Sequence, residues 1–142
     1  QTADAQSAVT DAPVLQGKRF LCAEDNALNA EILTELLKIE GARCTICENG
    51  KEIVDAFMQS AVGDYDMILM DVQMPVMNGY EATRAIRESH HPLAQTIPII
   101  AMTANAFSDD IQASFNAGMN GHVSKPVEMS VLEKAIRSID KH

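Results

Sequence analysis

The chain has 142 residues, a length typical of one folded domain, and 46% of them are hydrophobic while only 4% are aromatic. Its formal net charge of −9 argues against direct binding to nucleic acid, because phosphate backbones are bound by clustered Lys and Arg. The sequence has no apolar run long enough to cross a membrane and its first residues are polar. We therefore expect a cytoplasmic domain that makes no membrane contact of its own.

Residues 1–16 are rich in Ala, Gln, Ser, Thr and Asp and lack hydrophobic periodicity, so we expect a flexible linker or tail before a folded domain over residues 17–142. Short apolar runs and amphipathic stretches alternate five times along that domain. The predicted strands cover residues 18–23, 42–47, 67–71, 97–102 and 121–124, and a predicted helix follows each. Such alternation with short loops predicts a single five-stranded parallel sheet covered by helices on both faces, with the second strand at an edge.

Apolar residues at helical spacing predict which side of each helix faces the core. We expect Asn26 to cap the first helix and Gly41 to end it, with most of its apolar stripe buried. The residues expected on buried faces are Leu28, Ile32, Leu33, Leu36 and Leu37 in the first helix, Ile53, Val54, Phe57 and Met58 in the second, Ile111 and Phe115 in the fourth, and Leu132, Ala135, Ile136 and Ile139 in the fifth.

Three cysteines, Cys22, Cys44 and Cys47, fall on predicted strands. Cys44 and Cys47 form a C-x-x-C spacing, but a redox pair of this spacing needs the start of a helix, where the dipole lowers the thiol pKa. Positions i and i+3 of a strand face opposite ways. We interpret all three as buried reduced thiols, which indicates a reducing compartment.

A carboxylate, Asp71, ends the buried run that begins at Met67, and turn-forming residues follow it. Taken alone, Asp71 could be a solvated turn residue. In a doubly wound sheet, however, the residues just past each strand converge on one edge. The residues that we expect to meet there are Glu24 and Asp25 after the first strand, Asp71 after the third, Thr103 after the fourth and Lys125 after the fifth.

Three clustered carboxylates would repel one another unless a cation offsets their charge. Oxygen ligands without His or Cys favour Mg²⁺ completed by water over Zn²⁺. Such a site could use one carboxylate as a nucleophile toward phosphorus, with an ammonium and a hydroxyl stabilising the transferring oxygens.

These residues resemble the receiver domain of two-component response regulators, over about residues 18–140. The matching segments are the acidic pair Glu24-Asp25, the run Asp71-Val72-Gln73-Met74-Pro75-Val76-Met77-Asn78-Gly79, the pair Thr103-Ala104 and the pair Lys125-Pro126. The resemblance implies a flavodoxin-like (βα)5 fold with strand order 2-1-3-4-5. It also implies that the chain is a phosphoacceptor rather than an enzyme acting on a separate substrate, although it catalyses its own phosphotransfer and dephosphorylation.

The resemblance assigns a role to each matching residue. Asp71 would accept a phosphoryl group from a phosphohistidine, and Lys125 would pair first with Asp71 and then with the phosphate. Thr103 would bind the phosphoryl oxygens and move with them, and the peptide bond before Pro126 would be cis. The implied ligands of Mg²⁺, for which Mn²⁺ could substitute, are Glu24, Asp25, Asp71 and the main-chain carbonyl of Gln73.

The sequences of segments 24–29 and 102–107 are similar to those of receivers appended to hybrid sensor histidine kinases, so the parent chain could be such a kinase. The implied partner is a histidine kinase or a histidine phosphotransfer domain, and a weak homodimer is possible. In the family this partner docks on the first helix and on the loop after the fifth strand, and Asn26, Ala27 and Asn29 are the helix contacts that we expect. Receivers typically signal onward through the fourth helix, fifth strand and fifth helix.

One position departs from the family pattern. His122 stands where the family usually has Phe or Tyr; it could be a partly exposed edge-strand residue or a switch that moves with Thr103 and makes the output sensitive to pH. Gln73 and Asn105, each two positions past a site residue, are expected to control the lifetime of the acyl phosphate. His90 and His91 look like a metal pair only superficially, and we expect them in a surface loop.

Other functions fit the sequence less well. A phosphatase resembling the haloacid dehalogenase family would need D-x-D on the first strand, which here ends in Glu24-Asp25-Asn26. A flavin carrier would need a phosphate-binding loop where this chain has the acidic pair. A receiver-like interaction module that is not regulated by phosphorylation stays open, although the complete set of site residues speaks against it.

Overall fold

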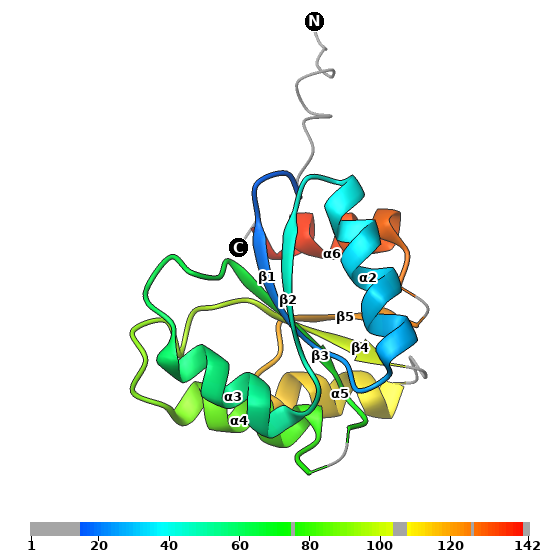
Figure 1. The fold of residues 1–142 in the computed structure, drawn as a ribbon. Coiled ribbons are helices and arrows are strands. Elements are labelled where there is room, and N and C mark those ends of the chain that lie inside the picture. The colour runs from blue at the N-terminus through cyan, green and yellow to red at the C-terminus, as the bar shows by residue number, and fades with distance from the viewer. Residues whose placement is uncertain (1–14, 75, 104–107, 126, 141–142) are drawn as a thin grey trace, which may run out of the picture.

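The computed structural model describes residues 15–74, 76–103, 108–125 and 127–140. Five strands form one parallel sheet in the order β2-β1-β3-β4-β5, as predicted, with β2 and β5 at its edges (Figure 1). The strands are β1 (Arg19–Ala23), β2 (Arg43–Cys47), β3 (Met67–Asp71), β4 (Ile99–Thr103) and β5 (Gly121–Ser124).

A helix follows each strand, and three of the helices begin at an asparagine cap. The helices are α2 (Ala27–Ile39), α3 (Gly50–Gln59), α4 (Gly79–Glu88), α5 (Ser108–Ala117) and α6 (Met129–Asp140). The side chains of Asn26, Asn49 and Asn78 each accept a hydrogen bond from the backbone N–H three residues later. Each bond satisfies a donor that has no partner within its helix.

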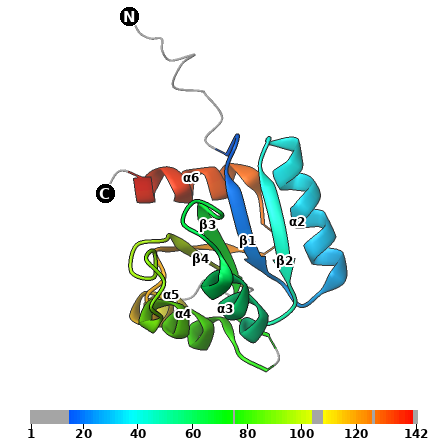
Figure 2. The same cartoon turned by 60° about the vertical axis from the view of Figure 1, so that its left-hand side comes forward.

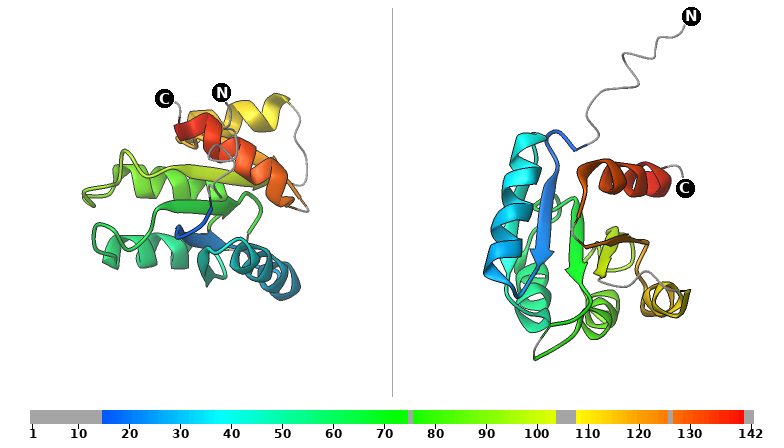
Figure 3. Two further views of the ribbon diagram at one scale, coloured as in Figure 1. Left: turned by 90° about the horizontal axis from the view of Figure 1, so that it is seen from above. Right: turned by 90° about the vertical axis from the view of Figure 1, so that its right-hand side faces the viewer.

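The helices cover both faces of the sheet, with α2 and α6 on one face and α3, α4 and α5 on the other (Figures 1 and 3). Successive strand residues point to opposite faces, so β1 sends Phe20 and Cys22 into one core and Leu21 and Ala23 into the other. Strand β3 is buried along its whole length, as a central parallel strand should be. None of the helices in the described ranges is long and apolar enough to span a membrane.

The folded part of the chain begins earlier than the predicted boundary at Gly17. Leu15 is fully buried in the core beneath α2 and α6, and the Gly17 N–H donates to the Gly41 carbonyl at 2.9 Å. A single leucine in a polar stretch carries no periodicity, which is why the sequence pattern missed it. The rest of the predicted tail, residues 1–14, lies outside the described residues.

Four apolar residues predicted in the core are exposed instead. They are Leu28, Ile32, Met58 and Phe115. In α2 the buried residues are Ala30, Leu33 and Leu37, so the core-facing stripe is rotated away from Leu28 and Ile32. In α5 the small residues Ser114 and Ala117 are buried and Phe115 is not. Small residues let a helix approach its neighbours closely, and a hydrophobicity pattern alone does not single them out.

Candidate active site

The carboxyl ends of four strands bring the predicted residues together at one edge of the sheet. Glu24 directly follows β1, Asp71 ends β3, Thr103 ends β4 and Lys125 directly follows β5. Together with Asp25 and Gln73 they line one cavity of about 240 Å³. All six residues lie where the topology places ligands in open α/β sheets.

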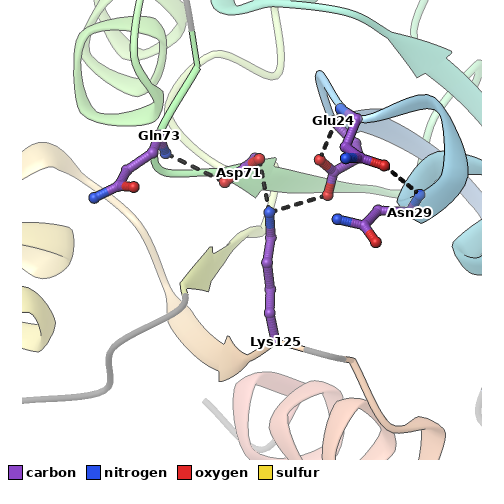
Figure 4. Close-up of polar contacts among 6 residues, drawn as sticks. Glu24, Asn29, Asp71, Gln73 and Lys125 are labelled. Carbon is purple, nitrogen blue, oxygen red and sulfur yellow. Dashed lines mark hydrogen bonds and ion pairs between the residues drawn. The ribbon is translucent and has the colours of Figure 1, made fainter.

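Lys125 is shared between two buried carboxylates, as Figure 4 shows. Its Nζ lies 2.8 Å from Asp71 Oδ2 and 3.1 Å from Glu24 Oε1. The second oxygen of each carboxylate accepts a backbone hydrogen bond, Asp71 from the Gln73 N–H at 3.2 Å and Glu24 from the Asn26 N–H at 3.1 Å. The backbone therefore fixes the orientation of both carboxylates while the ammonium draws them toward each other.

Asp71 and Glu24 are each only 3% exposed. Burial raises the pKa of Asp71 to about 6; Lys125 acts to lower this pKa, and the neighbouring charge of Glu24 acts to raise it. Burial acts to lower the pKa of Lys125, but its hydrogen bonds to Asp71 and Glu24 outweigh burial and the pKa is raised. Lys125 therefore stays an ammonium, and its single positive charge faces the carboxylates of Glu24 and Asp71, with Asp25 close by.

The acidic residues offer a set of donors that fits a hard divalent cation. Carboxylate oxygens of Glu24, Asp25 and Asp71 all lie within 4.8 Å of one another. Asp25 is exposed, so water can complete the coordination of an ion bound there. Oxygen-only ligands, few in number and open to water, are those that Mg²⁺ prefers.

Gly79 supports the strand end that carries Asp71. Its N–H donates to the Val72 carbonyl at 2.9 Å, and a Cβ at this position would lie 2.4 Å from the Asp71 carbonyl oxygen. The sequence pattern identified Gly79 as a turn former. Its close approach to β3 was missed, because backbone proximity across a turn leaves no signal in spacing or hydropathy.

The structure describes two further residues that the sequence analysis singled out, His122 and His91. His122 is half-buried on edge strand β5, opposite Ala101 in the register. Asn105 and Pro126 lie outside the described residues, so the structure does not address their predicted roles. Both ring nitrogens of His91 have protein partners, as expected of a structural residue rather than a metal ligand. Nδ1 accepts a hydrogen bond from the Leu93 N–H at 3.0 Å, and Nε2 lies 2.9 Å from the Ser60 carbonyl oxygen. It tethers the end of α3 to the loop before β4.

A doubly wound parallel sheet with an acidic cluster and a lysine at the ends of its strands defines a receiver-type signalling domain. The chain belongs to the response regulator receiver domain family, whose model matches residues 20–137. The finding confirms the fold and the family that the sequence motifs predicted.

Relatives and solved structures agree with this membership. The chain is 38% identical over 123 residues to Hybrid signal transduction histidine kinase I of Dictyostelium discoideum, covering 85% of this chain and 7% of that protein. It is 36% identical, with a TM-score of 0.75, to the receiver domain of sensor histidine kinase PA1611 from Pseudomonas aeruginosa PAO1, whose structure has a magnesium ion coordinated in the active site cleft; the match covers 87% of this chain and 98% of that one.

A third similarity is to a receiver that was crystallised with a partner. The receiver domain of Saccharomyces cerevisiae Ssk1, in complex with the histidine phosphotransfer signalling protein Ypd1, is 30% identical with a TM-score of 0.73, covering 87% of this chain and 88% of that chain. The curated relatives are much longer proteins, and the chain spans between 7% and 13% of the length of those compared. Several of the most similar relatives are hybrid histidine kinases, of which this chain matches the receiver.

Proposed function

We propose that this receiver accepts a phosphoryl group on Asp71 from a phosphohistidine of a histidine kinase or a histidine phosphotransfer domain. The observation that carries the proposal is the buried Asp71 carboxylate, held by Lys125 at 2.8 Å within the acidic cluster. In the transfer, an Asp71 oxygen forms a bond to phosphorus while the bond from phosphorus to the histidine nitrogen breaks and the nitrogen keeps the electron pair.

The other residues of the site would stabilise and position the transferring group. The Lys125 ammonium already contacts Asp71 and can follow the charge onto the phosphoryl oxygens. Thr103 lines the same cavity, and its hydroxyl would donate to one of those oxygens. When bound, Mg²⁺ or Mn²⁺ supplies positive charge that offsets the phosphoryl oxygens. The proposed metal ligands are Glu24, Asp25, Asp71 and the main-chain carbonyl of Gln73.

We also assign the control of acyl phosphate lifetime to Gln73 and Asn105. Gln73 lines the cavity, and in Figure 4 its side chain points away from Asp71 while its backbone N–H holds the carboxylate. Because Gln73 lines the cavity and its amide is uncharged, its side chain can affect how water approaches Asp71 without adding to the charge of the site. Asn105 lies outside the described residues, and its assignment rests on the family motif.

The docking surface for the phosphohistidine partner is proposed to lie beside the site on α2. A second hollow of about 300 Å³ adjoins Glu24 and Lys125. Its other lining residues are Asn29, Ile32, Leu33, Met102 and Val127. An apolar surface next to the phosphoacceptor suits a helical partner that must bring its histidine to Asp71. The Ssk1 receiver, which is similar to this chain, was crystallised in complex with the histidine phosphotransfer signalling protein Ypd1.

The proposed function is tested by incubating the protein with Mg²⁺ and acetyl phosphate and measuring the intact mass. We expect the wild type to gain one phosphoryl group and Asp71→Asn to gain none. Asp55→Asn is a matched control, because Asp55 is exposed on α3 and its ion pair within the described residues is with Lys51 alone, away from the site. Phosphorylation of Asp71→Asn would overturn the assignment, and a wild type that gains nothing would favour an interaction module.

The output step is proposed to run from Thr103 to His122. Residues 101 and 103 share a sheet face, and Ala101 is the register partner of His122. His122 and Thr103 are therefore diagonal neighbours on one face, so a movement of Thr103 can reposition the ring and alter the α5, β5 and α6 surface.

Nuclear magnetic resonance of the histidine rings tests this step. On phosphorylation, the His122 ring signals are expected to shift in the wild type and much less in Thr103→Ala, since that variant lacks the hydroxyl that would bind the phosphoryl group. The His91 ring, held by Leu93 and Ser60, is an internal control and should not shift. Unchanged His122 signals in the phosphorylated wild type would contradict the proposed switch.

A further inference from the structure

Two cysteines from neighbouring strands meet on the α2 side of the sheet, outside the active site. Cys22 on β1 and Cys44 on β2 have their Sγ atoms 2.9 Å apart, closer than two sulfur atoms approach without an attractive interaction. The strands β1 and β2 lie side by side with α2 next to them (Figure 2). The sequence pattern had drawn attention to the pair Cys44 and Cys47 instead.

The two thiols differ in access to solvent. Cys22 is fully buried in the core. Cys44 is half-buried on the edge strand and lines two surface hollows of about 260 Å³ and 560 Å³. Of the two cysteines, Cys44 is therefore the one that a small polar molecule in solvent would meet first, and Cys22 lies in contact with it.

The contact also affects the acidity of Cys44. Its side-chain hydrogen bond with Cys22 lowers the pKa of Cys44, burial acts to raise this pKa, and the Thr34 side chain also acts to lower it. The thiolate is the reactive form of a cysteine, so we expect Cys44, which is only half-buried, to react before the fully buried Cys22.

Cys47 provides an internal contrast. It packs in the core on the opposite face of the sheet, against α3 and α4. Burial raises its pKa to about 11, and the charge of Glu52 contributes. Cys47 has neither an accessible sulfur nor a thiol donor, so the C-x-x-C spacing does not form a pair, as the strand geometry predicted.

We propose that Cys22 and Cys44 form a peroxide-oxidisable dithiol, a modification site that does not depend on the proposed phosphoacceptor function. The Cys44 thiolate attacks one oxygen of hydrogen peroxide, forming an S–O bond while the O–O bond breaks and the departing hydroxide takes up a proton to become water. Cys22 then gives up its proton and attacks the Cys44 sulfur, forming the S–S bond. The S–O bond breaks, and the hydroxide leaves as water with the proton from Cys22. Two thiols and one peroxide give one disulfide and two waters.

The cross-link should be easily reversed. Cys44 is the register partner of Phe20, so Cys22 is its diagonal neighbour. Neighbouring strands lie about 4.8 Å apart and rise about 3.3 Å per residue, so diagonal positions of a parallel pair are about 8 Å apart at Cα. This is beyond the usual upper limit for a disulfide of about 7 Å. Edge strand β2 must shift slightly to close the bond, and strained disulfides are more readily reduced.

The proposal is tested by treating the full 142-residue chain with hydrogen peroxide, alkylating it under denaturing conditions and analysing it by mass spectrometry. We expect the wild type to lose two hydrogen atoms in mass, to retain one alkylatable thiol, and to recover three after incubation with glutathione. Cys47→Ser should still form the cross-link, which places it between Cys22 and Cys44 even though Cys44 and Cys47 share a tryptic peptide. Cys44→Ser should form none.

Three other results would each overturn the proposal. The first is that the wild type keeps three free thiols at peroxide doses that oxidise free cysteine. A second is a cross-link that persists in Cys44→Ser or disappears in Cys47→Ser. A third is a disulfide found only between two molecules. Cys22→Ser separates the steps, because Cys44 should then stop at the sulfenic acid, which dimedone traps; no dimedone adduct would remove Cys44 as the attacking thiol.

Discussion

At the scale of single residues, the site depends on backbone positions as much as on charged side chains. Asp71 is oriented by the Gln73 N–H and drawn to Lys125, and both contacts require β3 to end where it does. Gly79 fixes that strand end, since its own backbone packs against the Asp71 carbonyl without room for a side chain. A residue without a functional group is therefore part of what positions the phosphoacceptor.

Gly79→Ala is expected to displace the end of β3, because the new Cβ would lie 2.4 Å from the Asp71 carbonyl oxygen. Overpacking of this kind costs about 1–3 kcal/mol in free energy of unfolding. We expect urea denaturation to show that loss and the rate of phosphorylation by acetyl phosphate to fall. Gly121→Ala is the control, since its Cβ would meet only Ile139 Cδ1 at an ordinary 3.7 Å. Equal stability and equal rates in the two variants would contradict the role of Gly79.

At the scale of elements, the sequence predicted which segments are helices and strands better than which side of each helix is buried. The asparagine caps and the apolar runs identify the elements directly, since both are local chemistry. Which face is buried depends on the neighbours of each helix, and small residues such as Ala30 and Ser114 carry the contact where larger ones were expected. As a result, α2 exposes Leu28 (64%) in its first turn and Ile32 (48%), and Ile32 lines the hollow beside the active site.

The double variant Leu28→Asp with Ile32→Asp is expected to impair docking of the phosphohistidine partner without impairing the site. The two side chains are largely exposed, so the loss of folding stability should be small. We expect the rate of transfer from a phosphorylated histidine phosphotransfer protein to fall by about tenfold or more, as for the central residues of an interface. The rate with acetyl phosphate should not change.

Ile39→Asp provides the matched control for that variant, because Ile39 is 76% exposed at the opposite end of the same helix. It should leave both rates unchanged. If the double variant accepts phosphate from the protein donor as fast as Ile39→Asp does, the partner does not dock on this part of α2.

At the scale of the whole molecule, the topology was the most predictable feature, and it largely determines the site. Strict alternation of strands and helices predicts a parallel sheet, and a parallel sheet brings together residues as distant in sequence as Asp71 and Lys125, which are 54 positions apart. Contacts that depend on register across strands were not predictable. The Cys22–Cys44 contact follows from the register of β1 against β2, and the sharing of Lys125 with Glu24 needs a side chain that reaches from the end of β5 to the end of β1, which local patterns do not specify.

The acidic site should also affect the stability of the whole domain. The pKa of Asp71 rises from an ordinary value of 3.8 to about 6 on folding. Between these values the folded state binds more protons than the unfolded state, so this group makes stability fall as the pH rises from about 4 to 6. At about 1.4 kcal/mol per pKa unit, the full cost above pH 6 is on the order of 2–3 kcal/mol without metal.

Asp71→Asn is therefore expected to be more stable than the wild type at pH 8 in the presence of a chelator, because the variant buries no charge at this position. Urea denaturation between pH 4 and pH 8 should show the difference between the two proteins growing up to about pH 6 and then staying constant. Mg²⁺ should reduce the difference at pH 8, since an ion that binds only the folded state stabilises it by mass action and the wild type keeps all three carboxylates. A difference that does not change with pH, or that does not respond to Mg²⁺, would contradict the coupling of the Asp71 charge to folding and to the metal.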